Sequence, residues 1–151
     1  MKTLAYFFIS FLPWFLSGIF FSSNLSFYDE IHLPSFALPK NLFFPVWTIL
    51  YFFIAISMTI LLKKNYMRYE KEYKNSLFYN YIFNQSFLFF FFTLENIFLA
   101  FIDTVLIFIT SLFLYYETKE LNKKASYFLI PYVFFSIYAT LLTLVIYFMN
   151  L

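Results

Sequence analysis

Apolar residues in this chain form long runs, and charged residues separate the runs from one another. A helix that crosses a bilayer needs about 20 predominantly apolar residues, and most of the runs have about that length. One stretch, residues 77–116, is much longer. As a single helix it would measure about 60 Å, twice the thickness of the hydrocarbon core, so we expect a tight turn at Thr93–Asn96. The predicted spans are residues 4–21, 43–62, 77–92, 97–116 and 128–149.

This pattern predicts helices rather than strands. Backbone polar groups must be paired inside lipid, so a chain crosses it only as helices or as a closed barrel. The alternation typical of barrel strands is absent. The sequence therefore predicts an all-α membrane protein, a five-transmembrane-helix bundle that forms a single domain over residues 1–151. Pro13 and Gly18 interrupt the first run. Lys2 before it would also suit a signal anchor or a cleaved signal peptide, but the length of the run and Trp14 favour a span.

Charged residues gather on one side of the predicted bundle. Residues 63–75 and 117–124 read as charged, solvated loops, and with five spans they share a side with the N-terminus. The basic residues of that side are Lys2, Lys63, Lys64, Arg68, Lys71, Lys74, Lys119, Lys123 and Lys124, whereas the other side carries only Lys40. Basic residues favour the cytoplasmic side. We expect a multi-pass integral protein of a bacterial-type cytoplasmic membrane, with the N-terminus in the cytoplasm and the C-terminus outside.

Composition supports the membrane assignment and excludes several kinds of site. The chain is 63% hydrophobic, 28% aromatic and only 12% charged, whereas soluble domains average about 25% charged residues. The absence of cysteine excludes a disulfide framework and thiolate chemistry, and a single glycine excludes glycine-rich phosphate loops. A net charge of +2 is too small to indicate a nucleic-acid partner.

The loop before the second span and the start of that span are rich in proline and aromatic residues. Pro34 and Pro39 predict an extended lead-in, because proline fixes its own φ and keeps the preceding residue out of the helical region. Pro45 suits the first turn of the following helix. Trp47 and Tyr51 are four residues apart and share one face of it. Trp14, by contrast, fits an interfacial belt residue.

These residues resemble the translocator protein family, also called TspO or tryptophan-rich sensory proteins. The family pattern P-S-W-T-P-P, then F-G-P-V-W-T-x-L-Y, is matched by PSFALP at 34–39 and FFPVWTILY at 43–51. The family stretch Q-x-x-x-N-x-x-W, then F-F, A and D, is matched at Asn80, Asn84, Phe87, Phe91, Phe92, Ala100 and Asp103. The stretch P-Y-x-x-W-x-x-F-A-x-x-L-N is matched at Pro131, Tyr132, Phe135, Tyr138, Ala139, Leu142, Met149 and Asn150. Family tryptophans are replaced by Phe36, Phe87, Phe135 and Tyr147, so the chain reads as a divergent member.

The resemblance implies a pocket inside the bundle, closed by the loop Ser22–Lys40. The expected ligand-binding residues are Trp47, Tyr51, Asn84, Phe87, Phe135, Ala139, Leu142, Pro39 and Tyr28. The ligand would be a flat porphyrin or other tetrapyrrole, such as protoporphyrin IX or a heme-like molecule, with no obligatory cofactor. Membrane lipids and a second copy of the chain, in a homodimer, are the other expected partners.

Asp103, Asn80 and Asn84 are polar residues inside the predicted spans that could carry function. Asp103 is the only carboxylate clearly inside one, and no Lys or Arg lies inside any span to pair with it. It therefore pairs with a hydroxyl or amide (Thr104 or Asn84), stays protonated, or meets water. Asn80 and Asn84 suit either helix–helix hydrogen bonds or ligand contacts, and Asn84 suits the ligand better because it shares a face with Phe87. His32 has no partner at metal-ligand spacing and reads as a surface loop residue.

Three functions remain open from the sequence. The first is a receptor-like protein that binds a porphyrin for sensing, sequestration or translocation. The second is an enzyme that degrades porphyrin under light, a reaction in which the family tryptophan at Trp47 is implicated. A second family tryptophan in that reaction falls at Phe135, which is much harder to oxidise, so we expect binding with weak or no degradation and assign no catalytic residue. The third is a structural or assembly subunit without a small ligand.

Overall fold

Helices make up nearly all of the regular structure in the computed structural model, which describes residues 2–21, 26–65 and 70–151. No strand occurs within these ranges. The helices are α1 (Lys2–Phe11), η1 (Leu12–Phe15), α2 (Leu16–Phe21), α3 (Phe27–Glu30), η2 (Lys40–Leu42), α4 (Phe43–Lys63), α5 (Lys71–Leu88), η4 (Phe89–Thr93), α6 (Ile97–Leu121), α7 (Lys123–Tyr127) and α8 (Ile130–Met149). Among the described residues, four helical segments are long and apolar enough to cross a membrane: Lys2–Phe21, Lys40–Lys63, Ile97–Leu121 and Lys123–Met149.

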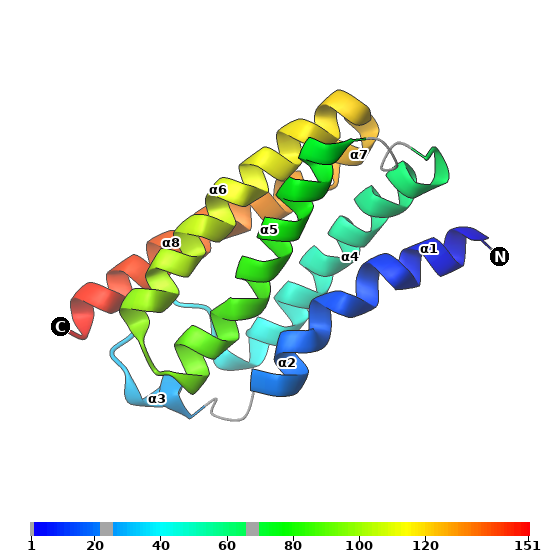
Figure 1. Cartoon of the computed structure of the whole chain (residues 1–151). Coiled ribbons are helices and arrows are strands. Elements are labelled where there is room, and N and C mark those ends of the chain that lie inside the picture. Colours follow the sequence, from blue (N-terminus) through cyan, green and yellow to red (C-terminus); the bar gives the residue numbers. More distant parts are fainter. Residues whose placement is uncertain (1, 22–25, 66–69) are drawn as a thin grey trace.

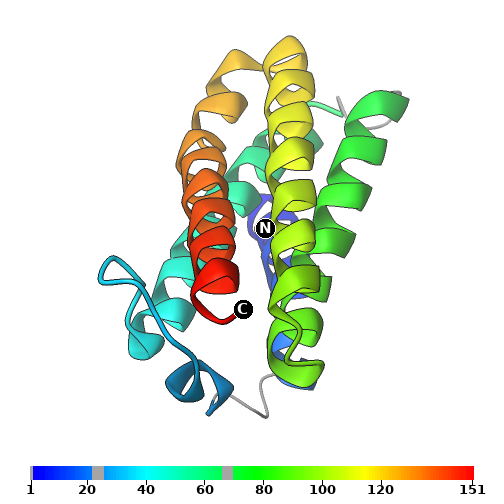
Figure 2. The same cartoon turned by 90° about the vertical axis from the view of Figure 1, so that its left-hand side faces the viewer.

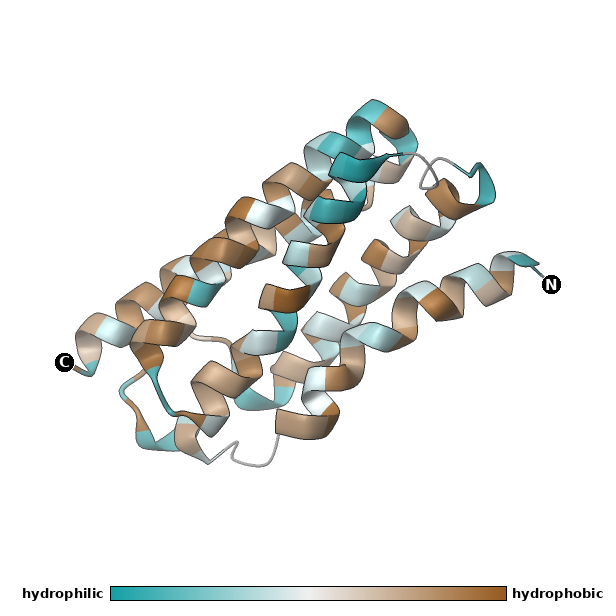
Figure 3. Cartoon of the chain, viewed as in Figure 1, coloured by the Kyte–Doolittle hydropathy of each residue, from teal (hydrophilic) through white to brown (hydrophobic). Residues whose placement is uncertain are grey.

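The long helices lie side by side in one bundle (Figures 1 and 2). α1 packs against α4, α5 against α6, and α6 against α8, while α2 packs against α5. The N-terminus lies at the same end as α7, and the C-terminus lies at the opposite end (Figure 1). Residues 26–42 cover that opposite end, and we call them the lid. Hydrophilic residues concentrate around the start of α5 and around α7 (Figure 3), which is the end where the sequence places its charged segments.

The first helical segment is broken where the sequence contains Pro13. A proline lacks the N–H that an α-helix needs, and here the chain forms a 3₁₀ turn, η1, between α1 and α2. The side chain of Gln85 on α5 satisfies backbone groups at this break. It donates to the Trp14 carbonyl at 3.2 Å and accepts from the Ser17 N–H at 2.8 Å. A helix from another part of the chain thus stabilises the kink.

The long apolar stretch 77–116 is divided at the predicted place. The π-helical turn η4 ends at Thr93, and α6 begins at Ile97. Asn96 caps α6, because its side chain accepts a hydrogen bond from the Leu99 N–H at 2.9 Å. The predicted turn at Thr93–Asn96 is therefore confirmed.

The predicted charged loops are too long. Residues 71–75 form the first turns of α5, and α6 continues to Leu121, so that only Asn122 separates it from α7. Charged residues such as Glu and Lys are good helix formers, and these turns extend the helices beyond the apolar part of the sequence. The lid also contains the short helix α3, which the proline pattern did not indicate. Ser22 and Arg68, assigned to loops from the sequence, lie outside the described residues.

Small hydroxyl side chains join α6 to α8. Ser111 and Ser136 are in hydrogen-bond contact at 3.1 Å, and Thr104 and Thr143 at 2.8 Å. All four side chains are buried. Short side chains let two helices approach closely and hydrogen-bond across their contact, which is typical of helix packing in lipid.

Candidate ligand-binding site

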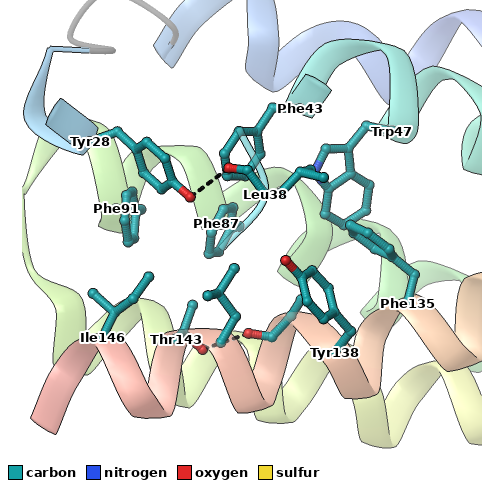
Figure 4. Close-up of a pocket in the computed structure, with 12 residues that line it drawn as sticks. Tyr28, Leu38, Phe43, Trp47, Phe87, Phe91, Phe135, Tyr138, Thr143 and Ile146 are labelled. Carbon is teal, nitrogen blue, oxygen red and sulfur yellow. Dashed lines mark hydrogen bonds between the residues drawn. The ribbon is translucent and has the colours of Figure 1, made fainter. Parts of the chain in front are cut away.

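A small cavity lies between the lid, α4, α5 and α8 (Figure 4). Its volume is about 20 Å³, which is room for about one water molecule. Its lining residues are Tyr28, Leu38, Phe43, Trp47, Phe87, Phe91, Phe135, Tyr138, Ala139, Leu142, Thr143 and Ile146. We call it the lid cavity.

Aromatic rings occupy most of the space around the lid cavity. The ring centroids of Trp47 and Phe135 are 5.3 Å apart with an interplanar angle of 81°, and those of Phe87 and Phe91 are stacked at 5.5 Å. Pairs of this kind contribute only about 0.5–1.5 kcal/mol beyond the burial of their area. The rings therefore close the cavity through contacts that a flat ligand can replace with its own. We call Tyr28, Phe43, Trp47, Phe87, Phe91 and Phe135 the aromatic cluster.

A larger cavity lies on the other side of Trp47, between the α1–α2 segment, α4 and α5. Its volume is about 440 Å³, within the range of about 300–1,000 Å³ found for small-molecule pockets. It shares Phe43, Trp47 and Phe87 with the lid cavity, so these side chains form the partition between the two spaces. Its lining residues are Trp14, Phe15, Ser17, Gly18, Ile19, Lys40, Phe43, Phe44, Trp47, Tyr51, Asn84, Phe87, Leu88 and Phe92. We call it the lateral groove.

A buried hydrogen-bond network lies one helical turn further from the lid than Trp47. The Tyr51 hydroxyl donates to Asn84 Oδ1 at 2.8 Å, and Asn84 Nδ2 donates to the Tyr132 hydroxyl at 3.1 Å. The Tyr132 hydroxyl then donates to Asn80 Oδ1 at 3.0 Å. These four side chains, the amide–tyrosine network, connect α4, α5 and α8. Each polar group that the bundle buries here has a partner, as burial in an apolar medium requires.

Two tyrosine hydroxyls donate hydrogen bonds to backbone carbonyls of the lid. The Tyr28 hydroxyl donates to the Leu38 carbonyl at 2.8 Å, within the lid itself. Burial and the neighbouring Tyr138 raise the pKa of Tyr28 to about 12, so its hydroxyl remains a neutral donor at physiological pH. The Tyr138 hydroxyl, from α8, donates to the Phe36 carbonyl at 3.0 Å.

The C-terminal end of α8 holds the lid through a paired contact. The Asn150 side-chain amide donates to the His32 carbonyl and accepts from the His32 N–H, each at 2.9 Å. Lys40 and Asp29 form an ion pair within the lid, and both side chains are exposed. The lid is thus connected to α8 by polar contacts at its surface, above the aromatic cluster.

Comparison with known proteins identifies the family. The TspO/MBR family profile matches residues 4–149, nearly the whole chain. The chain belongs to the TspO/MBR family. It is 34% identical over 149 residues to the "Tryptophan-rich protein TspO" of Bacillus cereus, covering 99% of this chain and 97% of that protein. It is 31% identical over 148 residues to the "Uncharacterized membrane protein YtaB" of Bacillus subtilis, covering 98% of this chain and 96% of that protein. It is 28% identical over 140 residues to the "Tryptophan-rich protein TspO" of Archaeoglobus fulgidus, covering 89% of this chain and 88% of that protein.

In this TspO/MBR chain the expected ligand residues are divided between the two cavities. Tyr51 and Asn84 line the lateral groove, while Trp47 and Phe87 line both spaces. Tyr28, Phe135, Ala139 and Leu142 line the lid cavity but not the lateral groove. Pro39 lines neither and borders a separate surface hollow within the lid. The partition at Trp47 thus separates residues that the sequence placed in one pocket.

The structure gives the two asparagines defined partners. Asn80 Nδ2 donates to the Ile107 carbonyl at 3.2 Å and to Thr110 Oγ1 at 3.0 Å, so Asn80 joins α5 to α6. Asn84 is bonded to Tyr51 and Tyr132, and it also lines the lateral groove. Asn80 therefore contributes helix–helix hydrogen bonds, whereas Asn84 combines such bonds with a position at the edge of a cavity.

Asp103 meets a hydroxyl group, one of the expected kinds of partner, but the hydroxyl belongs to Ser86 rather than Thr104. Its Oδ1 lies 2.8 Å from the Ser86 hydroxyl, and Thr104 bonds instead to Thr143. The Ser86 hydroxyl is also 2.9 Å from the Phe83 carbonyl. The Ser86 hydroxyl has one proton to donate, so it divides that proton between the Phe83 carbonyl and Asp103 Oδ1. Asp103 is 2% exposed, and its Oδ2 has no partner among the described residues.

Trp14 is buried, which corrects its assignment as an interfacial belt residue. It is 2% exposed, stacks on Tyr51 at 5.4 Å and meets Tyr81 edge to face at 5.3 Å. The 3₁₀ turn at Pro13 changes the direction of the side chains that follow, so a regular helical count does not place Trp14 correctly. Sequence reasoning also did not assign a contact to Tyr132 or Gln85. Tyr132 follows Pro131 in a quoted family stretch, but its position facing Asn80 and Asn84 depends on how α8 packs.

The described residues contain no cluster of three or more His, Asp and Glu side chains that could hold a metal ion. The His32 side chain is exposed in the lid, which confirms its assignment as a surface loop residue. What these cavities offer instead is an aromatic, apolar surface with few polar groups. That surface suits an apolar ligand with flat faces.

Proposed function

We propose that this TspO/MBR chain is a receptor-like membrane protein that binds a flat hydrophobic ligand, above all a porphyrin, for sensing, sequestration or translocation. The observation that carries the proposal is the partition at Trp47. On one side of it lie the rings that close the lid cavity, and on the other lies a groove of about 440 Å³. Moving Trp47 and Phe87 would join the two spaces into one aromatic pocket.

The chemistry of the walls favours a tetrapyrrole with its ring plane against the indole. Trp47 offers a flat stacking face and one N–H donor, and Phe87 and Phe135 offer further apolar surface. The carboxylates of a porphyrin would lie at the polar edge of the pocket, toward the lid. Ligand binding would then replace ring–ring contacts of the aromatic cluster with ring–ligand contacts of similar kind.

We also propose that α5 with η4 is a fifth membrane span. Its 23 residues would be about 34 Å long, enough for the hydrocarbon core. This segment is too polar on average to count among the four helical segments that are long and apolar enough to cross a membrane. Yet Asn80, Asn84 and Gln85 all bond to neighbouring helices, while Phe78 and Ile82 are exposed. Beyond Asn75 these polar side chains face the bundle, and the exposed residues up to Phe92 are Phe78, Tyr79 and Ile82, whereas the charged residues of α5 lie in its first turn.

With five spans the two termini lie on opposite sides, and the excess of basic residues at the N-terminal side argues for a cytoplasmic N-terminus. The lid would then face outward in a bacterial-type cytoplasmic membrane. Reporter fusions at each terminus test both proposals, and a cytoplasmic C-terminal reporter contradicts them. A homodimer, as the family resemblance implies, is tested by the mass of the purified protein in detergent or nanodiscs.

Titration with protoporphyrin IX tests the binding proposal. With the purified protein in nanodiscs, micromolar protoporphyrin IX should quench the tryptophan fluorescence saturably. The absorption band of the porphyrin should shift as it binds. Trp47→Ala should weaken the affinity about tenfold, because the lost stacking surface is worth about 1.4 kcal/mol. Ile49→Ala is the matched control, since Ile49 lies on the same helix but is exposed. Absence of a saturable absorption change in the unaltered protein would favour a structural subunit without a small ligand.

Light-dependent porphyrin breakdown is the second candidate, and one observation favours it. Trp47, Tyr51 and Trp14 form a row of rings with centroids 5.6 and 5.4 Å apart, so a second indole lies near Trp47 although Phe135 replaces the expected one. We still expect weak or no degradation, since Phe135 is the ring in direct contact with Trp47 on the lid side. Illumination of the complex decides between the two, and rapid bleaching that depends on Trp47 would favour the enzyme.

A further inference from the structure

The lateral groove opens on the outer surface of the bundle. Ile19 on α2 and Phe44 on α4 lie at its rim and are 72% and 70% exposed. Both belong to segments long and apolar enough to span a membrane. Large apolar side chains exposed on such segments face acyl chains. The groove is therefore in contact with the lipid phase.

The chain's single glycine lines this groove. A Cβ atom built at Gly18 would meet no other atom within 4 Å, so the position borders open space. A larger side chain at this groove-lining position would occupy space that is now open. Glycine is also unfavourable inside a helix by about 1 kcal/mol relative to alanine. Gly18 is the position at which the sequence keeps the groove open toward the lipid.

The groove extends along one leaflet. Along α4 its lining runs from Phe43 through Trp47 to Tyr51, which is about 12 Å at the standard rise per residue. Half of a hydrocarbon core about 30 Å thick is about 15 Å. The groove begins at the lid end, so it matches the depth of an acyl chain from the lid-side leaflet.

Charges of both signs lie at the lid end of the groove. Lys40 lines the groove, and its ammonium group is paired with the Asp29 carboxylate. Both side chains are exposed, and an exposed pair of this kind contributes at most about 1 kcal/mol, so its members are available to other partners. Glu30 follows Asp29 in the same short helix. This local excess of negative charge disfavours an anionic headgroup and favours a zwitterionic one with a primary ammonium group.

We infer that the lateral groove is a phospholipid site. It takes one acyl chain of an aminophospholipid from the lid-side leaflet, with the lipid phosphate at Lys40 and the lipid ammonium group at Asp29. This site goes beyond porphyrin binding, and a porphyrin that extends into the groove would displace the lipid. Lipid at this position would contact the partition residues Trp47 and Phe87 from the side opposite the lid cavity.

Brominated phospholipids test the inference, because bromine quenches tryptophan at short range and both tryptophans of the chain line the groove. In the Trp47→Phe protein only Trp14 fluoresces, and Trp14 is too buried for bulk lipid to reach. In phosphatidylcholine nanodiscs without porphyrin, dibrominated phosphatidylethanolamine should quench most of the Trp14 emission and saturate at a low mole fraction. The unaltered protein, with both tryptophans, provides a second measurement if the variant is unstable.

Gly18→Leu should abolish this quenching by filling the groove. Ala5→Leu is the matched control, since Ala5 is an exposed small residue earlier in the same segment and lies outside the groove. Brominated phosphatidylglycerol should require a higher mole fraction than phosphatidylethanolamine, and Asp29→Asn should remove the difference. If the brominated lipid quenches the Gly18→Leu and Ala5→Leu proteins equally, the groove is not a lipid site. Equal quenching by the two lipids in the unaltered protein would overturn the proposed headgroup.

Discussion

Two regions of the bundle interior are built on different principles. The aromatic cluster under the lid consists of ring contacts, whereas the amide–tyrosine network one turn deeper is held by directional hydrogen bonds. Ring contacts tolerate displacement, because dispersion and burial depend weakly on orientation. Hydrogen bonds between buried groups do not, since a broken one leaves an unpaired polar atom in an apolar medium. The cluster is therefore suited to open for a ligand and the network to keep the helices in place beneath it.

The largest expected effect comes from breaking the network. Asn80→Leu removes three hydrogen bonds and leaves the Tyr132 hydroxyl without its acceptor. We expect the free energy of unfolding to fall by about 1–3 kcal/mol. Thermal unfolding in detergent measures it, with Asn75→Leu as the control because Asn75 lies exposed on the same helix. An equal loss of stability in Asn80→Leu and Asn75→Leu would mean that the network does not stabilise the bundle.

The next largest effect tests the aromatic cluster. Phe135→Ala removes the ring that meets Trp47 edge to face and should weaken protoporphyrin binding about tenfold, for a loss of about 1.4 kcal/mol. Phe134→Ala is the matched control, because Phe134 is the adjacent residue and is largely exposed. If binding were instead equally affected by both, or by neither, the cluster would not be the ligand wall.

A smaller effect is expected at the lid. Asn150→Ala removes both hydrogen bonds to His32, worth about 1 kcal/mol together at an exposed site. We expect porphyrin to associate and dissociate several times faster while its equilibrium affinity changes little, which stopped-flow absorbance measures. Asn41→Ala, at an exposed position near the other end of the lid, is the control. Unchanged rates in Asn150→Ala would show that the lid does not limit ligand exchange.

The smallest effect is expected at Asp103. If this side chain already carries a proton, Asp103→Asn exchanges one neutral group for another and keeps an oxygen that accepts from Ser86. The melting temperature should then remain close to that of the unaltered protein. Asp103→Leu, which removes the contact with Ser86, should be less stable than Asp103→Asn. Thermal collapse of Asp103→Asn would show that a charged carboxylate is required at this position.

Most of the helical architecture follows from local patterns in the sequence. The apolar runs place the helices, and Asn96 after the break at Thr93 marks where α6 begins. The family motifs bring Trp47 and Phe135 to the same interior region, where their rings are in contact. These features depend on residue type and spacing, which are visible in one dimension.

The sequence alone therefore determined that the chain is helical, that it belongs in a membrane and that Phe135 lies in the same interior region as Trp47. Only the tertiary structure decided that Trp47 and Phe87 separate two spaces, that Trp14 is buried, and that Ser86 rather than Thr104 meets Asp103. The reason is geometric. Which side of a ring is empty, and which of several hydroxyls reaches a carboxyl group, depends on the rotation and approach of helices that are distant in sequence, and a kink such as that at Pro13 changes both.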